Sequence, residues 1–166
     1  MIVKTKADGA STKREINVTR SINAPRKLVF RAWTDPKQLA QWWGPHGFTN
    51  PVLEMEAYTG GSIRIVMRGP DGAEYQNSGI VCEVQEPEKL IFTTALEGER
   101  GNILVETLNI VTFSERGVWT QVAVSARVIN FVPEAAAMLD EMEDGLTQSL
   151  ERLDDLLTKV PASLLV

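Results

Sequence analysis

The sequence predicts an α+β fold in which a curved antiparallel sheet of six or seven strands wraps around one long C-terminal helix. Three observations support this fold. Two short helical segments follow the first strand, a series of alternating segments comes next, and one long amphipathic segment lies near the C-terminus. A twisted sheet whose buried face is covered by a single long helix leaves space between the two. The sequence therefore also predicts a cavity between sheet and helix.

The N-terminal region is expected to contain a short arm followed by the first strand. Residues 1–14 are polar and cationic, and we expect an N-terminal arm or an added edge strand that turns at Asp8-Gly9. Apolar and polar side chains alternate over residues 16–22, which is typical of a half-buried strand. Because no internal repeat or interior linker follows, we expect a single domain over residues 15–160.

Two short helices are predicted after this strand. Asn23 is suited to cap the first helix, and Asp35-Pro36 opens the second with a capping residue followed by proline. The second helix ends at Trp42-Trp43-Gly44-Pro45, which places two large apolar side chains, each burying about 200 Å², at the rim of the core. Because adjacent helical residues face different directions, we expect either Trp42 or Trp43 to form a cavity wall.

Six further strands are predicted where alternating patterns lie between short turn sequences. They cover approximately residues 52–58, 62–68, 75–84, 90–96, 105–113 and 118–128. The last element is a helix from Pro133 to about Thr158, roughly 26 residues or 39 Å long. Its apolar stripe is expected to bury as one unit and consists of Leu139, Met142, Leu146, Leu150, Leu153 and Leu157.

The composition argues against several classes of function. The chain has 166 residues and a net charge of −5, so no general attraction to nucleic acid or anionic lipid is expected. No apolar run approaches the ~18 residues of a membrane span, and the first residues lack the apolar core of a signal peptide. The single cysteine, Cys82, lies in an apolar strand and is expected to be a small buried hydrophobe. These observations favour a cytoplasmic protein.

The order of Thr19-Arg20, Leu28 to Pro36 and Trp42-Trp43-Gly44-Pro45 along the chain resembles the opening signature of one bacterial family of the SRPBCC (START/birch-pollen-allergen-like) superfamily. That family is the branch similar to the C-terminal domain of the activator of the heat-shock-protein-90 ATPase. The matching motifs cover residues 15 to about 157 in the family's order. They are Thr19-Arg20, Ala24-Pro25, Leu28 to Pro36, Leu39, Trp42-Trp43-Gly44-Pro45, Gly60-Gly61, Arg64, Met67 to Gly72, Tyr75, Glu83 and Gly145 to Leu153.

The resemblance implies a helix-grip fold with a hydrophobic tunnel between the sheet and the C-terminal helix. It implies no single function, because the superfamily includes lipid carriers, polyketide cyclases, oxygenase domains and chaperone regulators. Leu146 stands where the family usually has an aromatic residue after the helix glycine, which would enlarge or reshape the tunnel. Bacterial members of this branch typically lack the separate chaperone-binding domain, so the resemblance does not favour a chaperone partner.

The cavity is expected to be bounded by a few large side chains and to remain open because small residues recur on the inward faces. The inward faces of the strands are expected to be overwhelmingly apolar. Close packing of such faces would require bulky aromatic residues at several of these positions, and few are available. Gly145 either lets the last helix pack closely on the sheet or opens the tunnel. The expected ligand-binding residues, around an opening near His46, are Trp42, Trp43, Met67, Phe92, Met142, Gly145 and Leu146.

Three residues are candidates for acid–base chemistry. His46, the only histidine, follows Pro45 in a loop and is either a general base or an exposed loop residue. Glu83 lies in a strand where strict alternation could bury its carboxylate, and Tyr75 is one side chain that could pair with it. With one histidine and one cysteine we expect no metal site, and no cofactor motif is present.

Three hypotheses of function follow. The leading one is binding of a hydrophobic or aromatic small molecule in the cavity, with no catalysis assigned. The alternatives are a cyclase- or hydratase-type enzyme that uses the same cavity, and a chaperone-ATPase-activator-like domain that binds another protein. A homodimer is compatible with the sequence. Two convergent polar groups in the cavity would favour the enzyme, and an entirely apolar cavity would favour a carrier.

Overall fold

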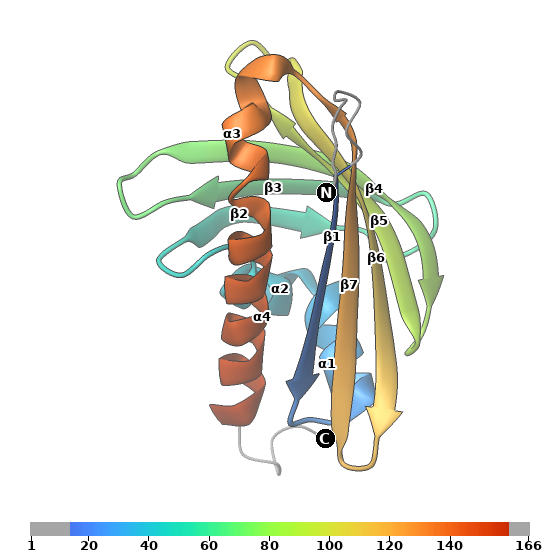
Figure 1. Ribbon diagram of the computed structural model, residues 1–166. Coiled ribbons are helices and arrows are strands. Elements are labelled where there is room, and N and C mark those ends of the chain that lie inside the picture. Colours follow the sequence, from blue (N-terminus) through green and yellow to red (C-terminus); the bar gives the residue numbers. More distant parts are fainter. Residues whose placement is uncertain (1–13, 160–166) are drawn as a thin grey trace, which may run out of the picture.

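The computed structural model describes residues 14–159 and is built around one antiparallel sheet of seven strands (Figure 1). The strands pair in the order β1-β7-β6-β5-β4-β3-β2, so β1 and β2 form the two edges. Their bounds are β1 Arg14–Ile22, β2 Thr49–Met55, β3 Ser62–Arg68, β4 Glu74–Gln85, β5 Lys89–Glu97, β6 Ile103–Arg116 and β7 Trp119–Phe131. The predicted α+β fold is confirmed; β3 has the predicted bounds, β2 begins and ends three residues earlier than predicted, and the other strands are longer than predicted. Residues 1–13, where the arm is predicted, lie outside the described range.

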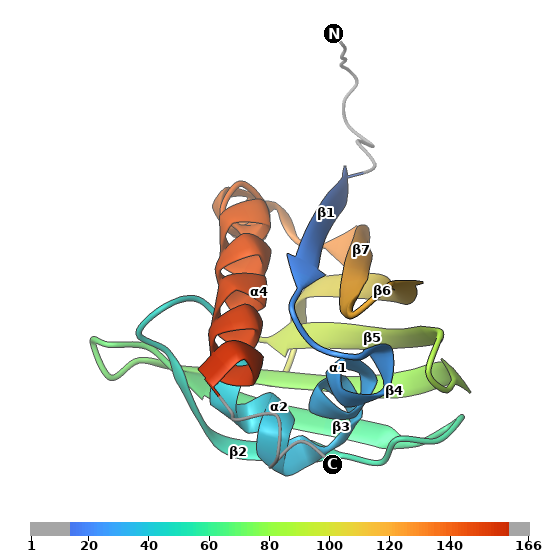
Figure 2. The ribbon, with the colours of Figure 1, turned by 90° about the horizontal axis from the view of Figure 1, so that it is seen from below.

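The helices lie on the concave side of the sheet. The long helix α4 (Met142–Lys159) packs along β1, while α1 (Arg26–Thr34) and α2 (Pro36–Trp42) occupy the other part of that face (Figure 2). The two short helices after the first strand are thus confirmed. Asp35 caps α2 as predicted, because its carboxylate accepts a hydrogen bond from the Lys37 amide at 3.0 Å. The predicted Asn23 cap is wrong, since α1 begins after Pro25 without a side-chain cap.

The predicted C-terminal helix is divided into shorter pieces. A 3-10 turn, η2 (Pro133–Ala135), leads into the single turn of α3 (Ala136–Leu139), and α4 begins only at Met142. The division lets the two parts pack on different regions of the sheet. Leu139 joins a small cluster with the ends of β6 and β7, whereas Leu150, Leu153 and Leu157 join the main core. The apolar stripe therefore does not bury as one unit.

The prediction that Cys82 is buried is wrong, because Cys82 lies on the outer face of β4. Val81 is fully buried, so its neighbours Ile80 and Cys82 point to the convex side, and Cys82 is exposed. The expectation of a buried thiol followed from the apolar neighbours of Cys82 in the sequence. The alternation of the strand, rather than this local composition, decides which of these side chains is covered.

Trp42 belongs to the aromatic core. Its side chain is fully buried, its indole N–H donates to the Ala32 carbonyl oxygen at 3.0 Å, and its ring meets that of Trp33 at 4.8 Å between centroids. Phe30 and Phe113 extend the same cluster toward β6. Trp42 thus anchors α2 to α1 and is not available to a ligand in this arrangement.

The turn that follows α2 is bound to α4 by one arginine. The Arg152 guanidinium donates hydrogen bonds to four backbone carbonyl oxygens, those of Gln41, Trp43, Gly44 and Pro45, at 3.0–3.1 Å. The last carbonyl groups of a helix have no partner within the helix and carry partial negative charge, so a cation at this position is favourable. Burial lowers the pKa of Arg152, but a guanidinium remains charged near neutral pH. We call this set of contacts the Arg152 clamp.

Neighbouring residues of α4 reinforce the clamp. The Ser149 hydroxyl accepts a hydrogen bond from the Gly44 amide at 2.9 Å and donates to the Gly145 carbonyl oxygen at 3.0 Å. The Gln148 side-chain oxygen accepts from the His46 amide at 3.0 Å. Gly44 has a φ of +99°, and a Cβ there would lie 3.0 Å from the Met67 methyl group, so both the conformation and the space favour glycine.

We expect Leu150→Ala to destabilise the protein by about 2–5 kcal/mol, because it removes a fully buried side chain between α4 and the sheet. Urea unfolding of the variant and its parent measures the difference. Val118→Ala is the control, since Val118 is 80% exposed and its truncation should cost less than about 0.5 kcal/mol. A loss below about 0.5 kcal/mol for Leu150→Ala would contradict the packing of α4.

We expect Arg152→Met to lower the free energy of unfolding by about 1.5–3 kcal/mol, because it removes charge-assisted hydrogen bonds from carbonyl groups at the end of α2. Arg152→Lys should recover only part of this loss, since one ammonium group cannot match a planar guanidinium with five N–H donors. Arg31→Met, at an exposed position of α1, is the matched control. Equal stability of the Arg152→Met and Arg31→Met proteins would show that the clamp contributes nothing.

Candidate functional site

A cavity of about 210 Å³ lies between α4 and the concave face of the sheet. The turn after α2 forms one wall, α4 forms the roof, and inward-facing residues of the sheet form the floor. The lining residues are Ile16, Trp43, Gly44, Pro45, Met67, Asn77, Thr94, Thr107, Asn109, Ala126, Met142, Gly145, Leu146 and Ser149. The predicted space between sheet and helix is therefore present.

A second cavity of about 180 Å³ adjoins the first near the break between α3 and α4. The two share four lining residues, namely Asn77, Thr94, Thr107 and Met142. Met138, which is 38% exposed, lines only the second cavity. Met142, whose unbranched side chain is flexible, is thus one of the residues where the two spaces meet.

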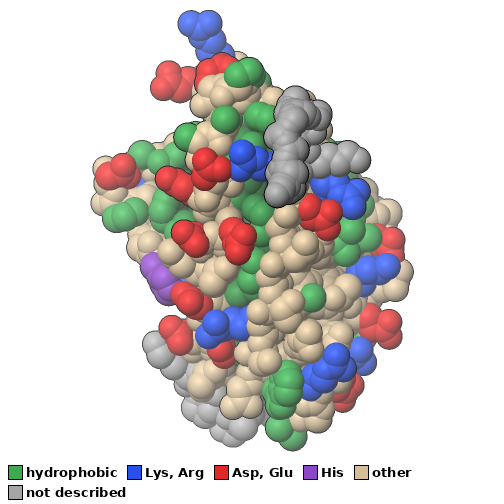
Figure 3. Space-filling model, viewed as in Figure 1, with side chains coloured by type: hydrophobic (Ala, Val, Ile, Leu, Met, Phe, Trp, Pro, Cys, Tyr) green, Lys and Arg blue, Asp and Glu red, His purple; other side chains and the backbone are tan. Residues whose placement is uncertain are grey.

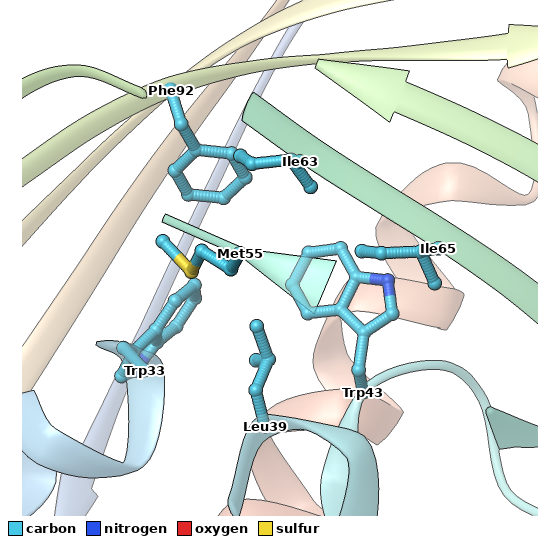
Figure 4. Close-up of a pocket in the computed structure, with 7 residues that line it drawn as sticks. All are labelled: Trp33, Leu39, Trp43, Met55, Ile63, Ile65 and Phe92. Atoms are coloured by element: carbon cyan, nitrogen blue, oxygen red, sulfur yellow. The ribbon is translucent and has the colours of Figure 1, made fainter. Parts of the chain in front are cut away.

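Five of the seven predicted ligand-binding residues line the main cavity, namely Trp43, Met67, Met142, Gly145 and Leu146. Trp42 does not, because it is buried in the aromatic core. Phe92 does not line it either. Its ring contributes instead to a separate gap of about 10 Å³ among Trp33, Leu39, Trp43, Met55, Ile63 and Ile65 (Figure 4). A space of that size holds at most one water molecule, so the gap is a packing defect.

The floor of the cavity is more polar than the sequence suggested. Thr107 and Asn109, which are 6% and 7% exposed, interrupt an otherwise apolar inner row of β6. Thr94 faces Thr107 across the β5–β6 pairing, and Asn77 lies on the next strand. The expectation of overwhelmingly apolar inward faces is wrong at these positions. Alternation along β6 could have located them, because every second residue from Val105 to Phe113 is buried and two of these are polar.

The three acid–base candidates do not meet in the cavity. His46, the only histidine, lies on the surface (Figure 3, purple). Its Nε2 is 2.9 Å from the Glu151 carboxylate. Tyr75 packs against the ring of Phe48 outside the main cavity, at 6.0 Å between centroids. None of the described residues that line either cavity is ionisable.

Glu83 is displaced from the inner face by a change of register. The β4–β5 pairing shifts between Val81 and Glu83, so simple alternation no longer places Glu83 inward. Its side chain is 39% exposed, lies 3.6 Å from the Lys89 ammonium and also hydrogen-bonds Gln85. The hypothesis of a buried carboxylate is therefore wrong, and Glu83 forms a surface ion pair.

The described part of the chain contains no group of three or more His, Cys, Asp or Glu residues that could hold a metal ion. Within residues 14–159, no helix combines the length and apolar character needed to cross a membrane. The lining of the cavity thus consists of apolar side chains, neutral hydroxyl groups, neutral amides and backbone. Such a set can enclose an uncharged molecule and form hydrogen bonds with it.

Solved structures share this architecture. A protein from Arthrobacter aurescens is 25% identical, with a TM-score of 0.78, and the match covers 89% of this chain and 87% of that one. The AHSA1 protein of Silicibacter pomeroyi is 22% identical, with a TM-score of 0.75, over 87% and 98% of the two chains. DynU16, from the dynemicin biosynthetic locus, is 23% identical, with a TM-score of 0.66, over 87% of this chain and 47% of its own.

No curated protein matches the chain significantly. A family model does match, over residues 23–158, which include the two short helices, six of the strands and nearly all of α4. The chain belongs to the family described as Activator of Hsp90 ATPase homolog 1-like protein, within the SRPBCC type of fold.

Proposed function

We propose that this protein binds a hydrophobic or aromatic small molecule in the cavity between the sheet and α4. The observation that carries the proposal is a partly open cavity of about 210 Å³ roofed by Met142 and Leu146 and walled by Trp43. An apolar cavity of about 150 Å³ is large enough to bind benzene, so this space suits a molecule of one or two rings.

The character of the walls supports an aromatic or apolar ligand. The indole of Trp43 offers a flat apolar surface, and the unbranched side chains of Met67 and Met142 adapt their shape to a guest. Gly145 keeps the roof open, since a Cβ built there would make an ordinary van der Waals contact with the Pro45 ring at 3.5 Å. Any large side chain at this position would occupy the space that the ligand is proposed to fill.

The alternatives have less support. Thr107 and Asn109 do bring two polar side chains together in the cavity, which is the arrangement that the enzyme hypothesis requires. However, a threonine hydroxyl and an asparagine amide are both un-ionised near neutral pH. A cyclase- or hydratase-type enzyme using acid–base chemistry needs a proton donor or acceptor within hydrogen-bond reach of its substrate. His46 and Glu83 are engaged in surface pairs with Glu151 and Lys89, and Tyr75 packs on Phe48. A chaperone-activating role is supported by the family description alone. We therefore assign no catalysis and no protein partner.

Uptake of an environment-sensitive apolar dye tests the proposal. The parent protein should bind the dye with a rise in fluorescence, and Gly145→Trp should abolish the rise, because the indole fills the cavity. Gly145→Ala should retain uptake, since its methyl group makes only an ordinary contact with Pro45. Glu143→Trp adds the same indole at an exposed position of α4 and should also retain uptake.

Circular dichroism and thermal unfolding establish that each of these variants is folded. Equal dye binding by the parent and a folded Gly145→Trp protein would mean that the dye does not occupy this cavity. The proposal would then lose its main physical support.

A further inference from the structure

Two polar side chains on the inner row of β6 have no role in the packing described so far. Thr107 and Asn109 are each more than nine-tenths buried, and both line the main cavity. They occupy alternate positions of one strand, so their side chains stand side by side, about 7 Å apart along the strand. Val105 and Val111 flank them on the same row and are apolar.

Both side chains keep hydrogen-bonding capacity free. The Asn109 amide nitrogen makes only long contacts, 3.3 Å to the Phe92 carbonyl oxygen and 3.4 Å to the Thr94 hydroxyl. Because a backbone carbonyl can only accept, the nitrogen must face Phe92, and the Asn109 side-chain oxygen remains free. No hydrogen bond between the described residues involves this oxygen or the Thr107 hydroxyl. Neither atom is among the fully occluded atoms without a partner, which within residues 14–159 are the Trp33 indole nitrogen and the Asn50 side-chain oxygen. Both atoms are therefore accessible to a hydrogen-bonding group inside the cavity.

The surroundings do not suit a charged ligand. None of the described residues that line the two cavities is ionisable, so a carboxylate or ammonium group there would be desolvated without a counter-ion. Arg152 lies beside the wall at Gly44, but its Nη1 and Nη2 groups donate to the four carbonyl oxygens of the clamp. Neutral polar groups are therefore the ones that this floor can pair.

We propose that Thr107 and Asn109 are specificity-determining residues that select an uncharged ligand bearing a hydroxyl group on an apolar, ring-containing body. The inference rests on the proposed binding function. The Asn109 oxygen accepts the hydrogen bond of the ligand hydroxyl, and the Thr107 hydroxyl donates to the ligand oxygen. The apolar roof of Met142 and Leu146 covers the rest of the ligand. The preferred class is thus phenol-like or alcohol-like molecules rather than hydrocarbons or organic acids.

Three probes with one ring system test this selectivity at pH 7, namely naphthalene, 2-naphthol and 2-naphthoate. A phenolic hydroxyl with a pKa near 10 stays protonated at this pH, whereas a carboxylic acid is ionised. We expect displacement of the apolar dye to give a Kd for 2-naphthol about fivefold lower than that for naphthalene. For 2-naphthoate we expect a Kd at least about tenfold higher than that for 2-naphthol.

Near-isosteric variants test whether Thr107 and Asn109 cause this selectivity. Thr107→Val and Asn109→Leu should each abolish the preference, so that the ratio of the Kd of naphthalene to the Kd of 2-naphthol falls from about five to about one. Thr120→Val is the matched control, because Thr120 is fully buried but its hydroxyl donates to the Ala24 carbonyl oxygen at 2.7 Å, outside the cavity. This control should preserve the preference for 2-naphthol.

The outcomes separate this inference from the proposed function. If the dye and naphthalene bind but 2-naphthol is not preferred, or if 2-naphthoate binds as tightly, the selectivity is refuted and the cavity function stands. Retained preference in folded Thr107→Val and Asn109→Leu proteins refutes the role of these residues. If one variant does not fold, the other decides the question. If neither the dye nor any probe binds the parent protein, the proposed function itself fails.

Discussion

The contact between Arg152 and the turn after α2 is the constraint on which the arrangement of the cavity depends. One guanidinium holds four carbonyl oxygens, and these belong to the segment that carries Trp43, Gly44 and Pro45 into the cavity wall. The same helix supplies the roof through Met142 and Leu146. The clamp therefore fixes wall and roof relative to each other, so the space between them is maintained by polar contacts at its margin rather than by apolar filling.

This constraint also explains why two adjacent tryptophans have different roles. Trp42 is the last residue of α2 and turns into the core against Trp33. Trp43 leaves the helix with an extended backbone, at φ −65° and ψ 134°, and its side chain reaches the cavity. The sequence predicts that one of the pair forms a wall, because adjacent positions diverge. It does not decide which one, because the direction depends on where the helix ends and on the clamp that holds that end.

Periodicity and turn residues predict the order and type of the elements, since apolar alternation and the capping sequence at Asp35-Pro36 are local properties. Features that depend on tertiary contacts are not predictable in this way. The register shift that turns Glu83 to the surface depends on the pairing of β4 with β5. The clamp joins Arg152 to residues more than a hundred positions earlier. Thr107 and Asn109 were accessible to sequence reasoning, because strict alternation along β6 places both on the buried row.

The cavity between the sheet and α4 is proposed to be a binding site. Backbone amide NMR during titration with 2-naphthol shows directly whether a ligand enters it. Saturable changes in amide chemical shift are expected at residues that line the cavity, including Thr107, Asn109, Gly145 and Leu146. The resonances of Tyr58 and Val118, which are exposed and do not line the cavity, should stay unchanged. Saturable changes confined to exposed apolar residues, with the resonances of the cavity residues unchanged, would show that 2-naphthol binds outside the cavity and would contradict the proposed site.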